Sequence, residues 1–436
     1  MKKKLISILK ADIYKYCLTK TSLYREVRTI NDIEKYRLSK FNLIWKDAYE
    51  NVPFYKEYKN RNILPNQIKT LNELDDWPII TKKNFQENSS KLLRKSPPNS
   101  WISTGGSTGE PLKLGSFNNG TSVSGNQWIG RASCGITPDM KCLLIWGHQH
   151  LYGKGFKRFI NITKRRFFDF LLNYNRLSGY DLSNEVLNDH FNKFLKYSPD
   201  YIISFSASLL AFCRANNSKK EQIKNNNLKG VICTAGPLTV SEKNEISFFF
   251  NCPVIMEYGS VECGVMAYSS TESYSYNVFW DTHLLDLEID DYGYNKNIVT
   301  RLTKEYVPII RYDIGDYLEI FNEDTKRPIK ISDVIGRPSD LIEMPGGIKI
   351  YSTLINDCVK QIQKVKAVQT IVNSESLDIH VICTEGLDES DKNLIIKRIN
   401  IVAPKLANIK LNIQRKEELI KTKGGKFPSV IYNKKE

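Results

Sequence analysis

The order of apolar segments along the chain is the feature that most limits its fold. Between residues 99 and 336, short apolar stretches that read as strands alternate with helical stretches, and this alternation predicts an α/β core. The clearest strands are CLLIW at 142–146, YIISF at 201–205, VICTAG at 231–236 and PVIMEYG at 253–259. Residues 277–320 read instead as consecutive strands, so we expect a β-rich subdomain there.

The chain has 436 residues, whereas one ordinary domain holds about 150. Its character changes after Arg337, where the sequence predicts paired strands, a helix and a closing strand: VQTIVN at 368–373, LDIHVICT at 377–384, DESDKNLIIKRINIV at 388–402 and IKLNIQR at 409–415. We therefore expect a large α/β domain with a β-rich subdomain over 1–336 and a small α+β domain over 337–436.

Charge and cysteine usage narrow the choice of partners. Lys and Arg outnumber Asp and Glu by 63 to 48, and the net charge of +15 favours anionic partners such as nucleotides. The basic residues are spread out and form no block interleaved with aromatics, so nucleic acid is not expected as the partner. Nine cysteines stand singly, without zinc-site spacing, and are expected to be buried, reduced thiols of a cytoplasmic protein.

The N-terminal stretch MKKKLISILKADIYKYCL has a basic start. Lys10 and Asp12 interrupt its apolar run, so it predicts neither a cleavable signal nor a membrane span. Its apolar residues fall near helical spacing, at Leu5, Ile6, Leu9, Ile13, Tyr16 and Cys17. Two placements are open: packing on its own domain, which we favour, or contact with the inner membrane surface.

The strongest local motif is STGGSTGEPLKL at 103–114. Its glycines and hydroxyl residues predict a loop whose backbone N–H groups can bind phosphate, and a plain surface loop is the alternative. The motif lacks the Lys-Ser/Thr ending of a P-loop, so a kinase-type or GTPase-type site is not expected. Four further motifs follow in order: EYGSVECG at 257–264, PIIRYDIGD at 308–316, IGRPSDLIEMPGGIKI at 335–350 and KTKGGKFPSV at 421–430.

Together the five motifs resemble the adenylate-forming superfamily of acyl-CoA synthetases, adenylation domains and luciferases. The resemblance is strongest to the branch of phenylacetate–CoA ligases and CapK-type capsule-biosynthesis proteins, whose opening is matched by AYENVPFYKEY at 48–58 and LDDWPIITKKNF at 74–85. It implies an ATP- and Mg²⁺-dependent ligase that joins a carboxylate to AMP and passes the acyl group to coenzyme A or to an amine. It also implies that the small C-terminal domain is a mobile lid.

The resemblance assigns a role to each motif. The phosphate loop would comprise Ser103, Thr104, Gly105, Gly106, Ser107, Thr108 and Gly109, and Lys113 is a candidate cation beside it. Gly236 and Pro237 would line the adenine. Tyr258 would stack beside the base, and Glu262 would bind Mg²⁺ through oxygen, the ligand that this hard cation prefers. A buried tyrosine and a surface glutamate are the alternatives.

Three residues follow from the later motifs. Asp316 would accept hydrogen bonds from the ribose hydroxyls, and Lys426 would be the catalytic lysine that stabilises charge on the α-phosphate. Arg337 would mark the hinge and would also bind the cofactor by reaching its ribose or phosphates. A turn aspartate, a solvated arginine and a tail lysine are the respective alternatives. The residue two positions after Arg337 is Ser339, where relatives often have an acid, while Asp340 comes one later. The pivot therefore stays open between Arg337 and Asp340.

The acid-binding pocket is marked weakly, by WGHQHLYGKGF at 146–156. Trp146, His148 and His150 are candidates to face the acid, with an ordinary loop as the alternative. Aryl, short aliphatic and amino acids remain open as substrates. His283 has no cysteine near it in the stretch where some relatives hold a metal, so we expect a structural histidine and no zinc. The alternative from another functional class is a catalytically inactive nucleotide-binding protein with the same fold.

Overall fold

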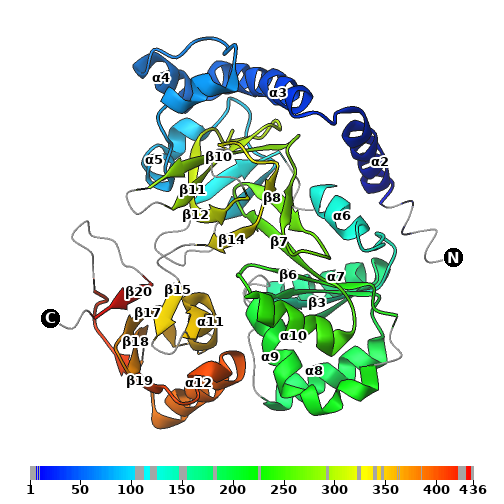
Figure 1. The fold of residues 1–436 in the computed structure, drawn as a ribbon, viewed down its shortest axis with the longest axis vertical. Helices are drawn as coiled ribbons and strands as arrows, with labels where there is room; N and C mark the ends of the chain where they lie inside the picture. The colour runs from blue at the N-terminus through cyan, green and yellow to red at the C-terminus, as the bar shows by residue number, and fades with distance from the viewer. Residues whose placement is uncertain are drawn as a thin grey trace. The chain divides into compact units, whose positions relative to one another are not determined.

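The computed structural model describes most of the chain. The described residues are 6, 8, 10–103, 112–117, 125–146, 155–179, 184–223, 227–290, 294–321, 326–336, 341–344, 348–360, 362, 364–383, 385–420 and 429–433. They form two compact units (Figure 1): the first comprises 1–9, 134–256 and 337–436, and the second comprises 10–133 and 257–336.

The first unit contains a parallel sheet in the order β4-β3-β5-β6-β7. Its strands are β3 (Cys142–Trp146), β4 (Tyr174–Ser178), β5 (Tyr201–Phe205), β6 (Gly230–Thr234) and β7 (Val254–Ser260), the last of which continues into the second unit. The connecting helices are α7 (Gly155–Leu171), α8 (Asn184–Tyr197), α9 (Ser206–Ala215) and α10 (Val240–Phe250), with the 3-10 helix η4 at Asn217–Ile223. The predicted α/β core is confirmed, and β3 and β5 coincide with the predicted segments.

Aromatic packing joins the helices of this core. Phe212 on α9 stacks on Phe250 of α10 with ring centroids 5.9 Å apart, and Phe191 and Phe194 of α8 lie within 6.2 Å of the Phe212 ring. Rings of this size bury large apolar areas, so the cluster fixes the helices on the sheet. A capping box at Thr239 begins α10 directly after the segment that follows β6.

The C-terminal part of the first unit is α+β, as predicted. It contains the hairpin β15 (Leu341–Met344) and β16 (Ile348–Tyr351), helices α11 (Ser352–Lys360), α12 (Glu389–Val402) and η7 (Pro404–Leu406), and a sheet in the order β19-β18-β17-β20. The sheet strands are β17 (Val365–Val372), β18 (Ser376–Cys383), β19 (Lys410–Arg415) and β20 (Val430–Tyr432). The β15–β16 hairpin and β20 were not predicted.

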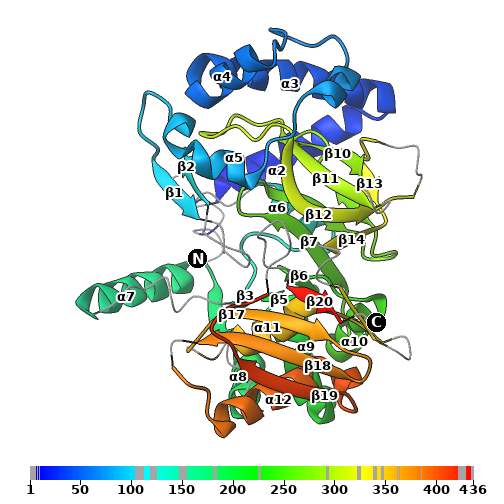
Figure 2. The same cartoon turned by 90° about the vertical axis from the view of Figure 1, so that its left-hand side faces the viewer.

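The second unit combines N-terminal helices with antiparallel strands (Figure 2). The helices are α2 (Ala11–Glu26), α3 (Ile30–Asn51), α4 (Pro53–Arg61), η1 (Leu71–Asp76), α5 (Lys82–Glu87), η2 (Ser89–Leu92) and α6 (Gly125–Ala132). One sheet runs β10-β11-β12-β14 and another runs β13-β9-β8-β7. The strands are β8 (Gly264–Ser269), β9 (Tyr276–Val278), β10 (His283–Ile289), β11 (Asn295–Arg301), β12 (Tyr312–Glu319), β13 (Lys330–Ile331) and β14 (Asp333–Gly336). The β-rich subdomain and the overall fold class are therefore confirmed.

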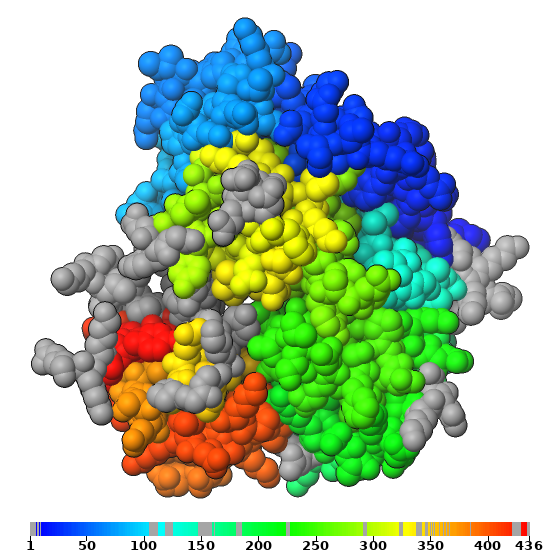
Figure 3. All heavy atoms as spheres, in the orientation of Figure 1, coloured from blue at the N-terminus to red at the C-terminus, as the bar shows by residue number. Residues whose placement is uncertain are grey.

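Helix α2 packs on its own unit, the placement that we favoured. The Tyr16 hydroxyl donates to Asn126 Oδ1 at 2.7 Å, and the Tyr24 hydroxyl donates to Asp281 Oδ1 at 2.8 Å. Lys20 forms an ion pair with the same Asp281. Figure 3 shows the N-terminal helices, in blue, lying against yellow strand residues of this unit. Among the described residues, no helix is long and apolar enough to cross a membrane.

All nine cysteines are free thiols. Seven of them are buried, as expected, whereas Cys17 and Cys134 are half-buried. Burial raises the pKa of Cys233 to about 12 because the thiolate loses its hydration. The Cys233 thiol is therefore protonated at neutral pH.

Candidate functional site

Two glycines build the turn that carries Glu262. A Cβ on Gly259 would lie 2.4 Å from the carbonyl oxygen of Gly264, so only glycine fits between β7 and β8 at this point. Gly264 itself has a φ of 71°, a conformation that favours glycine. The EYGSVECG motif therefore encodes a tight connection that fixes Tyr258 before it and Glu262 within it.

Tyr258 and Asp316, which are far apart in the sequence, meet through one hydrogen bond. The Tyr258 hydroxyl donates to Asp316 Oδ2 at 3.2 Å and accepts from Asn297 Nδ2 at 2.9 Å. Burial, together with the nearby Asp316 carboxylate, raises the pKa of Tyr258 well above its usual value, so the hydroxyl keeps its proton. This arrangement orients the Asp316 carboxylate.

Asp316 on β12 directly follows a glycine in the left-handed conformation. Asp313 Oδ1 accepts a hydrogen bond from the Gly315 backbone N–H at 2.9 Å, and Gly315 has a φ of 82°. Lys296 of the neighbouring strand β11 forms an ion pair with Asp313 at 2.7 Å. The PIIRYDIGD motif thus combines a left-handed glycine with side-chain contacts that fix the strand.

Glu262 is half-buried in the same unit as Tyr258 and Asp316. Its Oε1 accepts a hydrogen bond from the Tyr312 hydroxyl at 3.4 Å, and its backbone carbonyl accepts from Arg301 Nη1 at 3.4 Å. Among the described residues, no group of three or more His, Cys, Asp or Glu side chains could bind a metal. A single carboxylate still fits Mg²⁺ that is bound mainly by substrate phosphates and water.

His283 is a buried structural residue, as its isolation in the sequence indicated. Its Nε2 lies 2.8 Å from the Cys263 carbonyl, which can only accept, so Nε2 carries the proton. In the neutral ring Nδ1 then accepts from the Thr282 hydroxyl, 3.0 Å away. Burial is the main cause that lowers the pKa of His283 to about 3. The neutral ring fixes the backbone of Cys263, directly after Glu262.

The predicted phosphate loop joins two paired strands. β1 (Ser100–Ser103) and β2 (Lys113–Ser116) are antiparallel, with Ser103 opposite Lys113. A strand therefore follows the loop, where a P-loop would have a helix. The predicted residues Thr104, Gly105, Gly106, Ser107, Thr108 and Gly109 lie outside the described residues.

The first unit holds the other described candidates. The Gly236 carbonyl accepts from Ser206 Oγ at 2.7 Å, directly before Pro237. The Trp146 and Phe205 rings, at the carboxyl ends of adjacent parallel strands β3 and β5, have centroids 4.0 Å apart. This edge of a parallel sheet is where α/β proteins commonly bind ligands. The candidates His148, His150, Arg337 and Lys426 lie outside the described residues.

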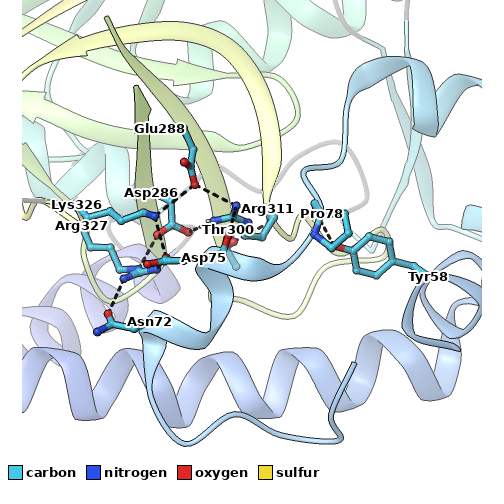
Figure 4. A network of polar contacts seen from close by, with 10 residues as sticks. All are labelled: Tyr58, Asn72, Asp75, Pro78, Asp286, Glu288, Thr300, Arg311, Lys326 and Arg327. Carbon is cyan, nitrogen blue, oxygen red and sulfur yellow. Dashed lines mark hydrogen bonds and ion pairs between the residues drawn. The ribbon is translucent and has the colours of Figure 1, made fainter. Parts of the chain in front are cut away.

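A buried ion network supports the strand that carries Asp316 (Figure 4). Asp286 of β10 is fully buried between Arg327, whose Nε lies 2.6 Å from Asp286 Oδ1, and Arg311, whose Nη1 lies 3.7 Å from Asp286 Oδ2. Arg311 also pairs with Glu288 at 3.1 Å, and Arg327 pairs with Asp75 of η1. Arg311 directly precedes β12, so the network ties the start of this strand to β10 and η1.

Sequence reasoning missed Asn297, Tyr312, Phe205 and Ser206 as neighbours of the candidates. Asn297 is fully buried, although NKNIVTR reads as a polar strand end. Its amide meets Tyr258 of β7, a strand of a different sheet, so the contact joins segments that are distant in the sequence. Strand alternation could have flagged a buried polar position, but not its partner.

A cavity of about 260 Å³ also lies in the second unit. It is lined by side chains that include Tyr24, Ser133, Tyr268, Thr271 and Phe279. None of the described candidates lines it. We therefore do not assign this cavity to the nucleotide.

Comparison with known proteins supports the resemblance. No protein-family model matches the chain. It is 23% identical over 390 residues to Protein CapK of Staphylococcus aureus, covering 86% of this chain and 83% of that one. It is 22% identical over 410 residues to a phenylacetate-coenzyme A ligase of Pseudomonas putida, covering 86% and 88% respectively.

Solved structures share the fold. A 2-hydroxyisobutyryl-CoA ligase bound to 2-HIB-AMP and CoA in the thioesterification state has a TM-score of 0.58 at 15% identity, covering 94% of this chain and 91% of that one. The same ligase in an open conformation has a TM-score of 0.55, with 93% and 92% covered. These relatives and fold neighbours are consistent with the adenylate-forming superfamily, as the motifs predicted.

Proposed function

From this kinship with adenylate-forming ligases, we propose that the chain activates a carboxylic acid as an acyl-adenylate with MgATP. The substrate carboxylate attacks the α-phosphorus of ATP, and pyrophosphate leaves with the electrons of the broken P–O bond. A nucleophile then attacks the acyl carbon, and AMP leaves. The observation that carries the proposal is the Tyr258–Asp316 hydrogen bond, in the same unit as Glu262.

The second unit offers two carboxylates suited to a nucleotide. Asp316 can accept from two neighbouring ribose hydroxyls with its two oxygens. The Tyr258 hydroxyl, which accepts from Asn297, donates to Asp316 and holds it in place. Glu262 is a candidate oxygen ligand for Mg²⁺, which would supply charge neutralisation at the phosphates. Ser103 and the residues after it, through Gly109, would bind the phosphate tail through backbone N–H groups and hydroxyls.

Residues of the C-terminal segment would complete the reaction. In our proposal, 337–436 acts as a small mobile domain that pivots between Arg337 and Asp340. Lys426, flanked by glycines in KTKGGKF, would stabilise the negative charge that grows on the α-phosphate. The lysine would withdraw for the second half-reaction.

The acid and the acceptor define the finer activity. We propose that Gly236 and Pro237 contact the adenine, and that Trp146 with His148 and His150 contacts the acid. Coenzyme A is our first choice of acceptor, because the phenylacetate-coenzyme A ligase of Pseudomonas putida matches over most of both chains. An amine of a sugar or other building block of a surface polysaccharide is the second candidate, favoured by the match to Protein CapK.

Pyrophosphate–ATP exchange with a panel of carboxylic acids tests the first half-reaction. We expect exchange with at least one acid and its loss in Lys426→Ala. Lys423→Ala is the matched control, since it removes the same charge three residues away, and it should retain exchange. No acid-dependent exchange above the Lys426→Ala level would favour a silent nucleotide-binding protein.

Acceptor choice is tested with the acid found in this way. AMP release that requires coenzyme A and ignores amino-sugar nucleotides would establish the thioester route. AMP release with the amine alone would establish the amide route.

A further inference from the structure

We propose that the exposed face of α7 docks on the surface of an anionic lipid bilayer. This inference concerns a helix of the first unit and goes beyond the proposed ligase activity. It rests on the exposure, spacing and charge of residues 159–170, and none of these residues is among the candidates for catalysis.

Apolar side chains cover one solvent-facing side of α7. Phe159, Ile160, Phe167 and Phe170 are 67%, 48%, 59% and 68% exposed. At about 100° per residue, these four side chains and Thr163 fall within one arc of about 100°. An apolar arc of this width is what a helix ordinarily buries against a core. Here it faces outward instead.

The side of α7 that lies beyond Arg166 attaches the helix to its own unit. Asp169 accepts from Arg176 Nε of β4 at 2.7 Å, and Ile162 is half-buried. Figure 2 shows α7 extending away from the sheet of its unit. The outward arc is therefore not the face by which the helix is anchored.

Cations border the apolar arc on both sides. On the same helical projection, Arg166 lies about 20° beyond one edge and Lys164 about 40° beyond the other, and both are exposed. Phe168, 46% exposed, lies beyond Lys164. Phenylalanines flanked by long basic side chains characterise helices that lie in the membrane interface, where the rings enter the acyl boundary and the cations remain at the headgroups.

The charge beside the apolar face of α7 favours lipid, rather than a second copy of the chain, as what binds there. A two-fold contact through this face would place Lys164 and Arg166 of one copy near those of the other, and each chain carries a net charge of +15. Anionic headgroups are instead attracted to these cations. Each cation near the surface raises the affinity of the protein for the membrane roughly fivefold. The surface that fits is therefore acidic lipid.

Vesicle flotation with the full chain tests the proposal. We compare vesicles of phosphatidylcholine alone with vesicles of equal parts phosphatidylcholine and phosphatidylglycerol. Binding is expected to the second kind only, and to weaken in about 1 M salt, where the Debye length falls to about 3 Å. Binding to neither kind, by a protein that is folded by circular dichroism, would overturn the proposal.

Paired variants locate the contact. Phe167→Ser combined with Phe170→Ser should lower binding by roughly tenfold for each ring removed, whereas Phe248→Ser, which removes a ring 71% exposed on α10, should leave it unchanged. Lys164→Gln combined with Arg166→Gln should also weaken it. If the Phe248 and α7 variants lose equal amounts of vesicle binding, the proposal is overturned. It is also overturned if the wild type binds no lipid but is a dimer by light scattering, and the α7 variants are monomers.

Discussion

Removal of the Asp286 carboxylate should destabilise the second unit strongly. Its oxygens lie 2.6 Å from Arg327 Nε and 3.7 Å from Arg311 Nη1, in a fully buried position. Breaking a buried ion pair from one side typically costs about 3–5 kcal/mol, because a desolvated charge is left uncompensated. Arg311 keeps Glu288 and Arg327 keeps Asp75 as partners, so we expect a loss near the lower end, about 3 kcal/mol, for Asp286→Ala.

Urea unfolding followed by circular dichroism measures this loss. Asp189→Ala serves as the control, because it removes an exposed carboxylate that pairs with Lys193 at 2.5 Å within one helix. Such pairs contribute about 0.3–0.5 kcal/mol. If Asp286→Ala changes the free energy of unfolding by no more than the control does, the buried network does not anchor β12 and the reasoning fails.

Three further perturbations test the parts of the candidate site. Gly259→Ala should lower stability and abolish acid-dependent exchange, because its Cβ would meet the Gly264 carbonyl at 2.4 Å. Gly386→Ala should do neither, because a Cβ there would meet nothing nearer than the Arg415 side chain at 4.0 Å. The low pKa of His283, about 3, means that the unfolded chain binds a proton below pH 6.5 that the folded chain does not. From pH 7 to 5 the wild type should therefore lose about 2 kcal/mol of stability that His283→Gln does not lose; equal pH slopes in urea unfolding would contradict this. Asp316→Asn should raise the KM for ATP at least tenfold in exchange assays, while the free energy of unfolding changes by about 1 kcal/mol or less. An unchanged KM would show that Asp316 does not bind the ribose.

The sequence predicted local structure well where backbone constraints are local. Apolar runs bounded by turn residues predicted β3 and β5 to the residue. These features depend on a few adjacent residues, so periodicity and turn chemistry were sufficient.

Contacts between distant segments were beyond sequence reasoning. Asn297, Asp286 and Arg327 look like ordinary surface polar residues, yet the first two are fully buried. Their partners lie on distant segments, among them β7 and η1, which no local pattern encodes. The outward apolar face of α7 escaped notice for a related reason, since helical periodicity shows an apolar side but not what covers it.

We propose that the second unit binds the nucleotide through Asp316 and Glu262. A crystal structure with AMP or a non-hydrolysable acyl-adenylate analogue tests it most directly. We predict the ribose hydroxyls within hydrogen-bond distance of the Asp316 carboxylate, with Tyr258 still beside it. A nucleotide bound elsewhere, with the Tyr258–Asp316 hydrogen bond intact and no ligand near either carboxylate, would show that this unit does not bind it.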